Sequence, residues 1–203
     1  MPTLHDPTWD TARSSDPEYV WRHLANGNTR YVTGAQAHPR LGDEDRRALL
    51  DGQSPHAAVL GCCDSRVPTE LILDQGLGDL FTVRSAGTVL DDVVLGSLEY
   101  AVDMLGVPLV VVLGHQACGA IAAACDHAAR KKVLSGRVAS VLSGVTAAAL
   151  TAPSPEREIL QVHAVVEGIL EHSPAIRAAV EEGRTALVGA HYSLETGEVT
   201  RLS

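Results

Sequence analysis

Two short polar clusters in the sequence carry the side chains best suited to bind a metal ion. They are Gly61–Arg66 and Gly114–Gly119. Between them they contain Cys62, His115 and Cys118, and sulfur with imidazole donors favours zinc in a tetrahedral site. His115 and Cys118 are three residues apart, so they share a face if the chain turns helical there. Three protein ligands leave a fourth position for water, which predicts a catalytic zinc site.

A carboxylate and a guanidinium follow the first of these cysteines. Side chains alternate along an extended chain, which places Asp64, and Arg66 if the extension persists, on the side of Cys62. Two thiolates and a neutral imidazole cancel the charge of Zn²⁺, so this centre should acidify water less strongly than a three-histidine site. We therefore expect Asp64 to orient the water and help to deprotonate it, and Arg66 to hold Asp64 as an ion pair. Alternatively, Asp64 itself takes the fourth position in a closed state, more readily at low pH.

The composition of the chain disfavours two classes of partner. A net charge of −9 argues against non-specific binding to nucleic acid, which needs a basic face. No apolar run approaches the ~20 residues that a membrane span needs. The N-terminal residues 1–10 lack a basic region followed by an apolar stretch, which predicts a cytoplasmic protein. In a reducing compartment cysteines serve as ligands or core residues, and we expect Cys63 and Cys125 to be core residues.

Buried strands must position the two clusters. The apolar pattern predicts strands at 57–61, 80–84, 109–113, 185–190 and 199–202, helices at 18–26, 43–50, 93–105, 119–133, 155–170 and 174–182, and a loop at 147–155. This alternation predicts an α/β fold with a parallel sheet. Ligands of such sheets bind beyond the carboxyl ends of the strands, where both clusters lie. We expect residues 1–50 to form a helical arm and residues 51–203 to form the zinc-binding catalytic domain.

The motif CxDSR at residues 62–66, followed by GHxxCG at 114–119, resembles the β-class carbonic anhydrases. The segments at 52–55, 83–84 and 99–101 also match, and the likeness extends from about Leu24 to the C-terminus. The resemblance implies a parallel sheet of order 2-1-3-4 with a fifth edge strand and helices on both faces. It also implies a homodimer or homotetramer whose N-terminal helices cover the neighbouring subunit.

The same resemblance assigns roles to individual residues. Cys62, His115 and Cys118 would bind one zinc ion per subunit, and Asp64 with Arg66 would be the catalytic dyad. The residues expected to line the substrate pocket, part of which comes from a second subunit, are Ser65, Phe81, Tyr100 and Gly119. Many members carry a pocket glutamine at the position of Gly76, so Gln75 is the candidate for that role.

The implied reaction is the reversible hydration of carbon dioxide to bicarbonate and a proton, with attack by zinc-bound hydroxide. Two alternatives stay open from the sequence. A hydrolase of carbonyl sulfide or carbon disulfide could use the same scaffold, because the same nucleophile could attack those carbons. A non-catalytic zinc or thiol-redox sensor could use the cysteines alone, but it would have no need of Asp64 and Arg66.

Overall fold

A five-stranded sheet forms the centre of the protein in a computed structural model, which describes residues 14–130 and 136–202. The strands are β1 (Ala57–Cys62), β2 (Leu80–Ser85), β3 (Leu109–His115), β4 (Ala186–Tyr192) and β5 (Val199–Arg201). Their order is β2-β1-β3-β4-β5. The first four are parallel, and β5 pairs antiparallel with β4 at the edge. This confirms the predicted strand order and the fifth edge strand.

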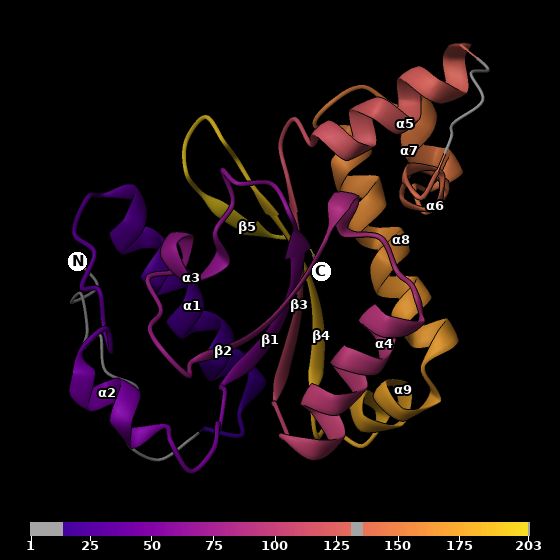
Figure 1. The fold of residues 1–203 in the computed structure, drawn as a ribbon. Coiled ribbons are helices and arrows are strands. Elements are labelled where there is room, and N and C mark those ends of the chain that lie inside the picture. Colours follow the sequence, from indigo (N-terminus) through magenta and orange to yellow (C-terminus); the bar gives the residue numbers. More distant parts are fainter. Residues whose placement is uncertain (1–13, 131–135, 203) are drawn as a thin grey trace.

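Helices cover both faces of the sheet (Figure 1). One face packs against α1 (Pro17–Val32) and α3 (Thr69–Ile72), and the other packs against α4 (Asp92–Glu99), α8 (Glu156–His172) and α9 (Pro174–Glu181). A third cluster, made by α5 (Gly119–Arg130), α6 (Val138–Ser143) and α7 (Ala147–Thr151), lies beyond the carboxyl ends of the strands. The helices α5 to α7 therefore stand beside the place where the two polar clusters meet.

The central strands β1 and β3 are buried along their whole length. Burial on both faces explains why these strands are continuous apolar runs without polar alternation. Gly114, near the end of β3, allows α8 to approach closely, because a Cβ atom there would lie 2.4 Å from Cγ2 of Val162. The sheet and α8 thus hold the end of β3 in a fixed position.

Two predicted elements differ from the structure. The helix expected at 93–105 ends at Glu99 and continues as a π-helical turn, Tyr100–Met104. The prediction of a loop at 147–155 is wrong, because α7 occupies the first half of this segment and Ala149 is completely buried. Alanine favours a helix, and packing of this face against α8 stabilises it. The predicted end of the α5 helix, at residues 131–133, lies outside the described residues.

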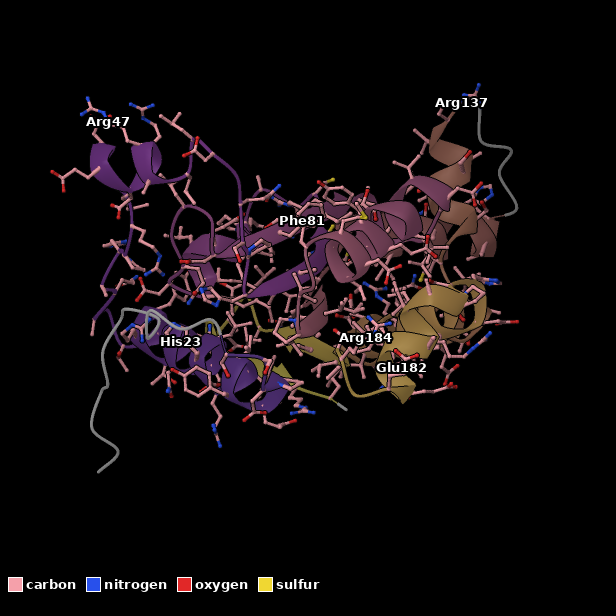
Figure 2. The ribbon with its side chains drawn as sticks, turned by 90° about the horizontal axis from the view of Figure 1, so that it is seen from below. His23, Arg47, Phe81, Arg137, Glu182 and Arg184 are labelled. Carbon is pink, nitrogen blue, oxygen red and sulfur yellow. The ribbon has the colours of Figure 1, made fainter. Side chains whose placement is uncertain are left out.

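The N-terminal region has two parts with different environments. In α1, which is capped by the Asp16 carboxylate and begins with Pro17, Val20 and Leu24 are fully buried in the core of the sheet. The short helix α2 (Asp43–Ala48) has no buried residue, and Figure 2 shows its Arg47 standing away from the body of the molecule. The division into an arm and a catalytic domain at residue 50 stays a prediction. Among the described helices, none is long and apolar enough to cross a membrane.

Candidate metal centre

The carboxyl ends of β1 and β3 bring the two polar clusters together. β1 ends at Cys62, β3 ends at His115, and the two strands are neighbours in the sheet. After β3 the chain turns back through Ala117, which has a φ of 53°, and α5 begins at Gly119. This turn carries Cys118 back over the strand ends. The strand order changes direction at β1, which is where a parallel sheet forms its binding crevice.

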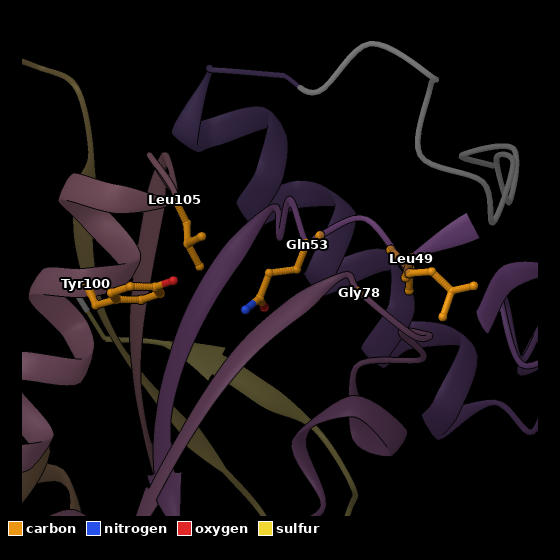
Figure 3. Close-up of a pocket in the computed structure, with 7 residues that line it drawn as sticks. Leu49, Gln53, Gly78, Tyr100 and Leu105 are labelled. Atoms are coloured by element: carbon orange, nitrogen blue, oxygen red, sulfur yellow. The ribbon is translucent and has the colours of Figure 1, made fainter. Parts of the chain in front are cut away.

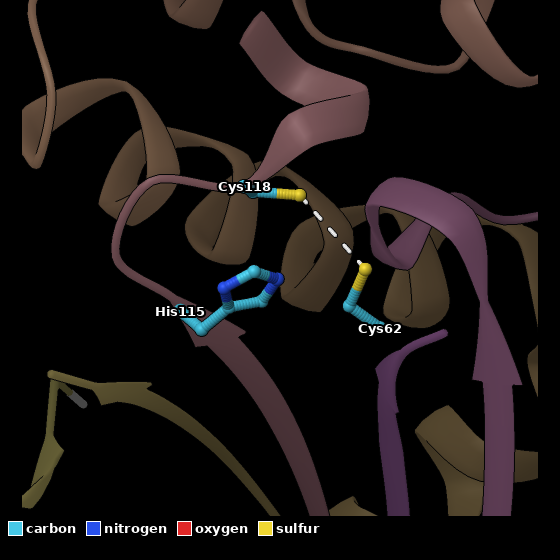
Figure 4. Close-up of side chains that lie close together, drawn as sticks. All are labelled: Cys62, His115 and Cys118. Atoms are coloured by element: carbon cyan, nitrogen blue, oxygen red, sulfur yellow. Dashed lines mark hydrogen bonds between the residues drawn. The ribbon is translucent and has the colours of Figure 1, made fainter. Parts of the chain in front are cut away.

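The side chains of Cys62, His115 and Cys118 point toward one another (Figure 4). One ligand atom of each residue lies within 4.8 Å of the others, and the two sulfur atoms are 3.9 Å apart. All three residues are buried. Nδ1 of His115 donates to the carbonyl oxygen of Gln116 at 3.0 Å, which leaves Nε2 free to act as a ligand. This buried Nε2 has no hydrogen-bond partner among the described residues.

The pKa values of the two cysteines are shifted in opposite directions. A hydrogen bond from Cys118 lowers the pKa of Cys62 well below its usual range, against the effect of burial. The Cys62 sulfur in turn raises the pKa of Cys118. Burial alone would lower the pKa of His115, but the adjacent Cys62 sulfur, which favours a charged imidazole, outweighs burial and raises it. A divalent cation would therefore displace protons from this cluster when it binds, which is the behaviour of a metal site built from thiolates and imidazole.

The predicted ion pair of Asp64 and Arg66 is formed beside the cluster. Nε and Nη2 of Arg66 donate to the two carboxylate oxygens at 2.9 and 2.7 Å, and its backbone N–H donates to Oδ1 at 2.9 Å. These contacts hold the pKa of Asp64 far below its usual range. Oδ2 of Asp64 is 3.9 Å from Nε2 of His115. The carboxylate is thus ionised and lies next to the ligand atoms.

Two of the expected pocket residues lie at the same end of the sheet. Ser65 is exposed between Asp64 and Arg66, and Gly119 is exposed after Cys118, with open space where a side chain would begin. The expectation for Cys63 was wrong, because this cysteine is exposed. β1 ends one residue earlier, so Cys63 lies in a surface loop and the core ends at Cys62. Cys125 is partly buried in the helical cluster, and its thiol donates to Ala149 O.

The other expected pocket residues lie at the opposite end of β2. Phe81 is the second residue of this strand and packs against Tyr100, with ring centroids 6.0 Å apart. Four residues along a strand correspond to about 13 Å, so Phe81 lies well away from the level of Cys62 in the same chain. Gln75 is buried, and its amide donates to the carbonyl oxygens of Leu73 and Asp74. Within one chain, these three side chains do not join the metal cluster.

Backbone groups contribute contacts for which the sequence analysis had no signal. The N–H of Gly87, which has a φ of 77°, donates to Sγ of Cys62 at 3.4 Å. The carbonyl oxygen of Ala117 accepts a hydrogen bond from Nη2 of Arg66 at 3.2 Å. The pattern G-T after β2 is compatible with many turns, so only the fold shows that this turn faces a sulfur ligand.

Comparison with known proteins agrees with the geometry of the site. The family model described as carbonic anhydrase matches residues 57–199. The chain is 43% identical to the carbonic anhydrase of Mycolicibacterium smegmatis, over 92% of this chain and 93% of that protein. It is 42% identical to carbonic anhydrase 2 of Mycobacterium tuberculosis, over 91% and 92% of the two chains.

Solved structures agree with the sequence comparisons. One is the β-carbonic anhydrase CcaA, with a TM-score of 0.69 and 23% identity over 90% of this chain and 95% of that one, which shows the fold. Another comes from a pair of tetrameric β-carbonic anhydrases of Sordaria macrospora, with a TM-score of 0.68 and 25% identity over 92% and 98% of the chains. The family match covers both strand ends and all three clustered ligand residues, so the chain belongs to the carbonic anhydrases, in their β class.

Proposed function

We propose that Cys62, His115 and Cys118 hold one zinc ion per subunit, which this carbonic anhydrase uses to hydrate carbon dioxide reversibly to bicarbonate and a proton. The observation that carries the proposal is the cluster of three buried ligand atoms within 4.8 Å, one of which, Nε2 of His115, has no hydrogen-bond partner in the described part of the chain. Two sulfur donors and one imidazole are a donor set that suits zinc. When bound, zinc supplies the Lewis acidity that makes water a nucleophile near neutral pH.

Asp64 and Arg66 would act on the water that reacts. Because Arg66 keeps the pKa of Asp64 very low, the carboxylate stays ionised and can only accept hydrogen bonds. Because the pKa of Asp64 is so low, its carboxylate can accept a hydrogen bond from a water molecule and orient it. It is too weak a base to keep the proton. Arg66 is itself tied to the second cluster through Ala117 O, which keeps the dyad aligned with the sulfur ligands.

A closed state remains part of this proposal. The 3.9 Å distance from Oδ2 of Asp64 to Nε2 of His115 is short enough that a rotation of Asp64 away from Arg66 would bring the carboxylate to the ligand atoms. Asp64 would then compete with water as the fourth ligand. The intact ion pair with Arg66 favours the open arrangement.

The pocket for carbon dioxide would be completed by a second subunit, as a homodimer or within a homotetramer. β2 is an edge strand, so its outer side is open to pairing. Antiparallel pairing of two β2 strands about a twofold axis would bring the amino end of one beside the carboxyl end of the other. Phe81, Tyr100 and Gln75 of one subunit would then lie near the metal cluster of its partner.

The exposed surface at this end of β2 supports such an assembly. A groove of about 630 Å³ lies there, and Figure 3 shows Tyr100, Leu105, Gln53 and Leu49 around it. Leu50, which also lines the groove, is 74% exposed, and Tyr100 is 47% exposed. Apolar side chains exposed together in this way are typical of an interface. The relatives from Sordaria macrospora are described as tetrameric, which agrees with an assembly.

We expect the protein to work in a reducing compartment, because its ligands include two thiols. A reducing compartment such as the cytoplasm would keep Cys62 and Cys118 as free thiols that are able to bind zinc. This prediction can be checked by fractionation of the cells that make the protein.

Metal analysis and stopped-flow hydration of carbon dioxide test the function directly. We expect the purified protein to contain about one zinc ion per subunit and to hydrate carbon dioxide, whereas Cys62→Ser should lose both properties because it removes a thiolate ligand. Turnover of carbonyl sulfide and carbon disulfide, measured in parallel, should be much slower. Zinc-loaded protein without hydration activity would contradict the proposal and would favour a sensor.

A further inference from the structure

A single arginine at the end of β2 contacts the whole loop that leaves β1. Nε of Arg84 donates to the carbonyl oxygen of Cys62 at 2.8 Å. Its Nη2 donates to the carbonyl oxygen of Asp64 at 2.7 Å and to that of Val67 at 3.3 Å. Among the described residues, the hydrogen bonds of the Arg84 guanidinium all go to this one loop. The Arg84 guanidinium thus joins backbone positions that are five residues apart in the chain.

The loop needs such a partner because it leaves the sheet at this point. β1 ends at Cys62, and the N–H of Cys63 still donates to Ser85 O on β2. Beyond it the chain bends, and the N–H of Val67 donates to Asp64 O. Carbonyl groups that have left a strand must find other donors. A planar guanidinium offers several donors in a fixed arrangement, so one side chain can serve carbonyl groups that face different directions.

Both chemical functions of the site depend on the conformation of this loop. At its start Cys62 presents its sulfur to Cys118, and two residues later Asp64 presents its carboxylate to Arg66. We propose that Arg84 is a positioning residue, which holds the loop from Cys62 to Val67 so that the sulfur ligand and the Asp64 carboxylate face the metal position together. This inference rests on the proposed zinc site. It assigns to Arg84 a role that differs from that of Arg66, because Arg66 binds the carboxylate and Arg84 binds the backbone.

The test measures metal affinity and coordination in Arg84→Ala. Competition with a chromophoric chelator should show zinc binding weakened by about 10- to 100-fold, as is common when a contact that orients a ligand is lost. The absorption spectrum of the cobalt-substituted protein should change as well, because the position of the Cys62 sulfur changes. Guanidinium chloride at concentrations well below denaturing ones should restore part of the zinc affinity, and sodium chloride at equal ionic strength should not.

The matched control is Arg177→Ala. Arg177 lies on α9, far from the cluster in sequence, and its exposed guanidinium also donates to a backbone carbonyl, that of Leu170. We expect this variant to keep the zinc affinity and the cobalt spectrum of the wild type. If Arg84→Ala does not fold, Arg84→Lys replaces it, because lysine keeps the charge but cannot reach carbonyls in three directions. This variant should bind zinc more weakly than the wild type.

Two results would overturn the inference. One is a zinc affinity and cobalt spectrum in Arg84→Ala, or in Arg84→Lys, equal to those of Arg177→Ala. The other is a loss of affinity that guanidinium restores no better than sodium chloride does. A wild-type protein that binds no zinc would instead refute the proposed function, so the two failures can be told apart.

Discussion

The two ends of β2 have opposite characters. At the carboxyl end, Cys62, His115 and Cys118 are buried, and hydrogen bonds within the same chain hold the two sulfur atoms and Nδ1 of His115. At the amino end, Tyr100 and Leu50 are exposed around an open groove. One chain therefore builds the complete ligand set for the metal but leaves apolar surface uncovered at the other end. The difference fits the proposal that a single chain supplies all the metal ligands, whereas the substrate pocket needs a second subunit.

Removal of the charge of Asp64 should have the largest effect at the carboxyl end. In Asp64→Asn we expect kcat for carbon dioxide hydration to fall by about 10²- to 10⁴-fold, because the amide cannot draw a proton from water. Zinc content should not change, since all three ligands remain. Asp126→Asn is a matched control, because Asp126 forms an exposed ion pair with Arg130 on α5. Unchanged turnover in Asp64→Asn would show that the metal cluster acts without the dyad.

The next largest effect is expected on stability, from loss of the buried ion pair that holds the segment leading to α2. Asp74 pairs with Arg30 at 2.6 Å and accepts the N–H groups of Ala37 and His38, which lead toward α2. Asp74→Asn leaves Arg30 buried without its counter-charge, so we expect the free energy of unfolding at pH 7 to fall by about 3 kcal/mol. Denaturant unfolding measures this, with Asp126→Asn as the control that should change little.

The pH dependence of that loss follows from the pKa of Asp74. Burial alone would raise this pKa, but the N–H groups of Ala37 and His38 and the Arg30 guanidinium outweigh burial and lower it. A carboxyl with a lowered pKa stabilises the fold above its unfolded value of about 3.9, and this contribution disappears as the pH falls through the folded pKa. The stability difference between wild type and Asp74→Asn should therefore be largest at about pH 6 to 7 and smaller at about pH 3. A difference that grows on acidification would contradict this reading.

A charge in the exposed groove tests the amino end. Leu50→Asp should raise the dissociation constant of the assembly by about 10-fold or more, because an unpaired carboxylate would be buried at the interface. Light scattering after size exclusion measures the mass, and hydration activity should fall with dissociation. Val138→Asp is the control: Val138 is also exposed, at 58%, but it follows Arg137, which Figure 2 shows at the opposite end of the molecule from Arg47 on α2. Dissociation by both variants alike would remove the distinction between the two surfaces.

The smallest effect is expected for Cys63→Ser. Cys63 neighbours Cys62 in sequence, but it is exposed and is not part of the cluster of Cys62, His115 and Cys118. Zinc content and turnover should match the wild type. A large loss of either would mean that the thiol takes part in the site, as a redox sensor would require.

The parts of the chain differ, for physical reasons, in how far local sequence patterns predict their structure. Strands β1 and β3 were predicted well, because burial on both faces demands continuous apolar residues. The helix α7 was missed, because its five residues are too few to show a helical period, and packing of Ala149 against α8 and α5 stabilises it. Cys63 was misplaced because the point at which a strand leaves the core cannot be read to within one residue.

The sequence by itself determined which atoms can bind the metal, since the types and spacing of Cys62, His115 and Cys118 already define a zinc donor set. It also determined the α/β class, because strand and helix periodicities are local properties of the chain. Only the tertiary structure decided that Arg84 on β2 spans the carbonyls of the loop after β1, and that Phe81 and Tyr100 lie away from their own chain's metal cluster. Such contacts depend on strand order and register, which join residues distant in sequence and which no single segment specifies.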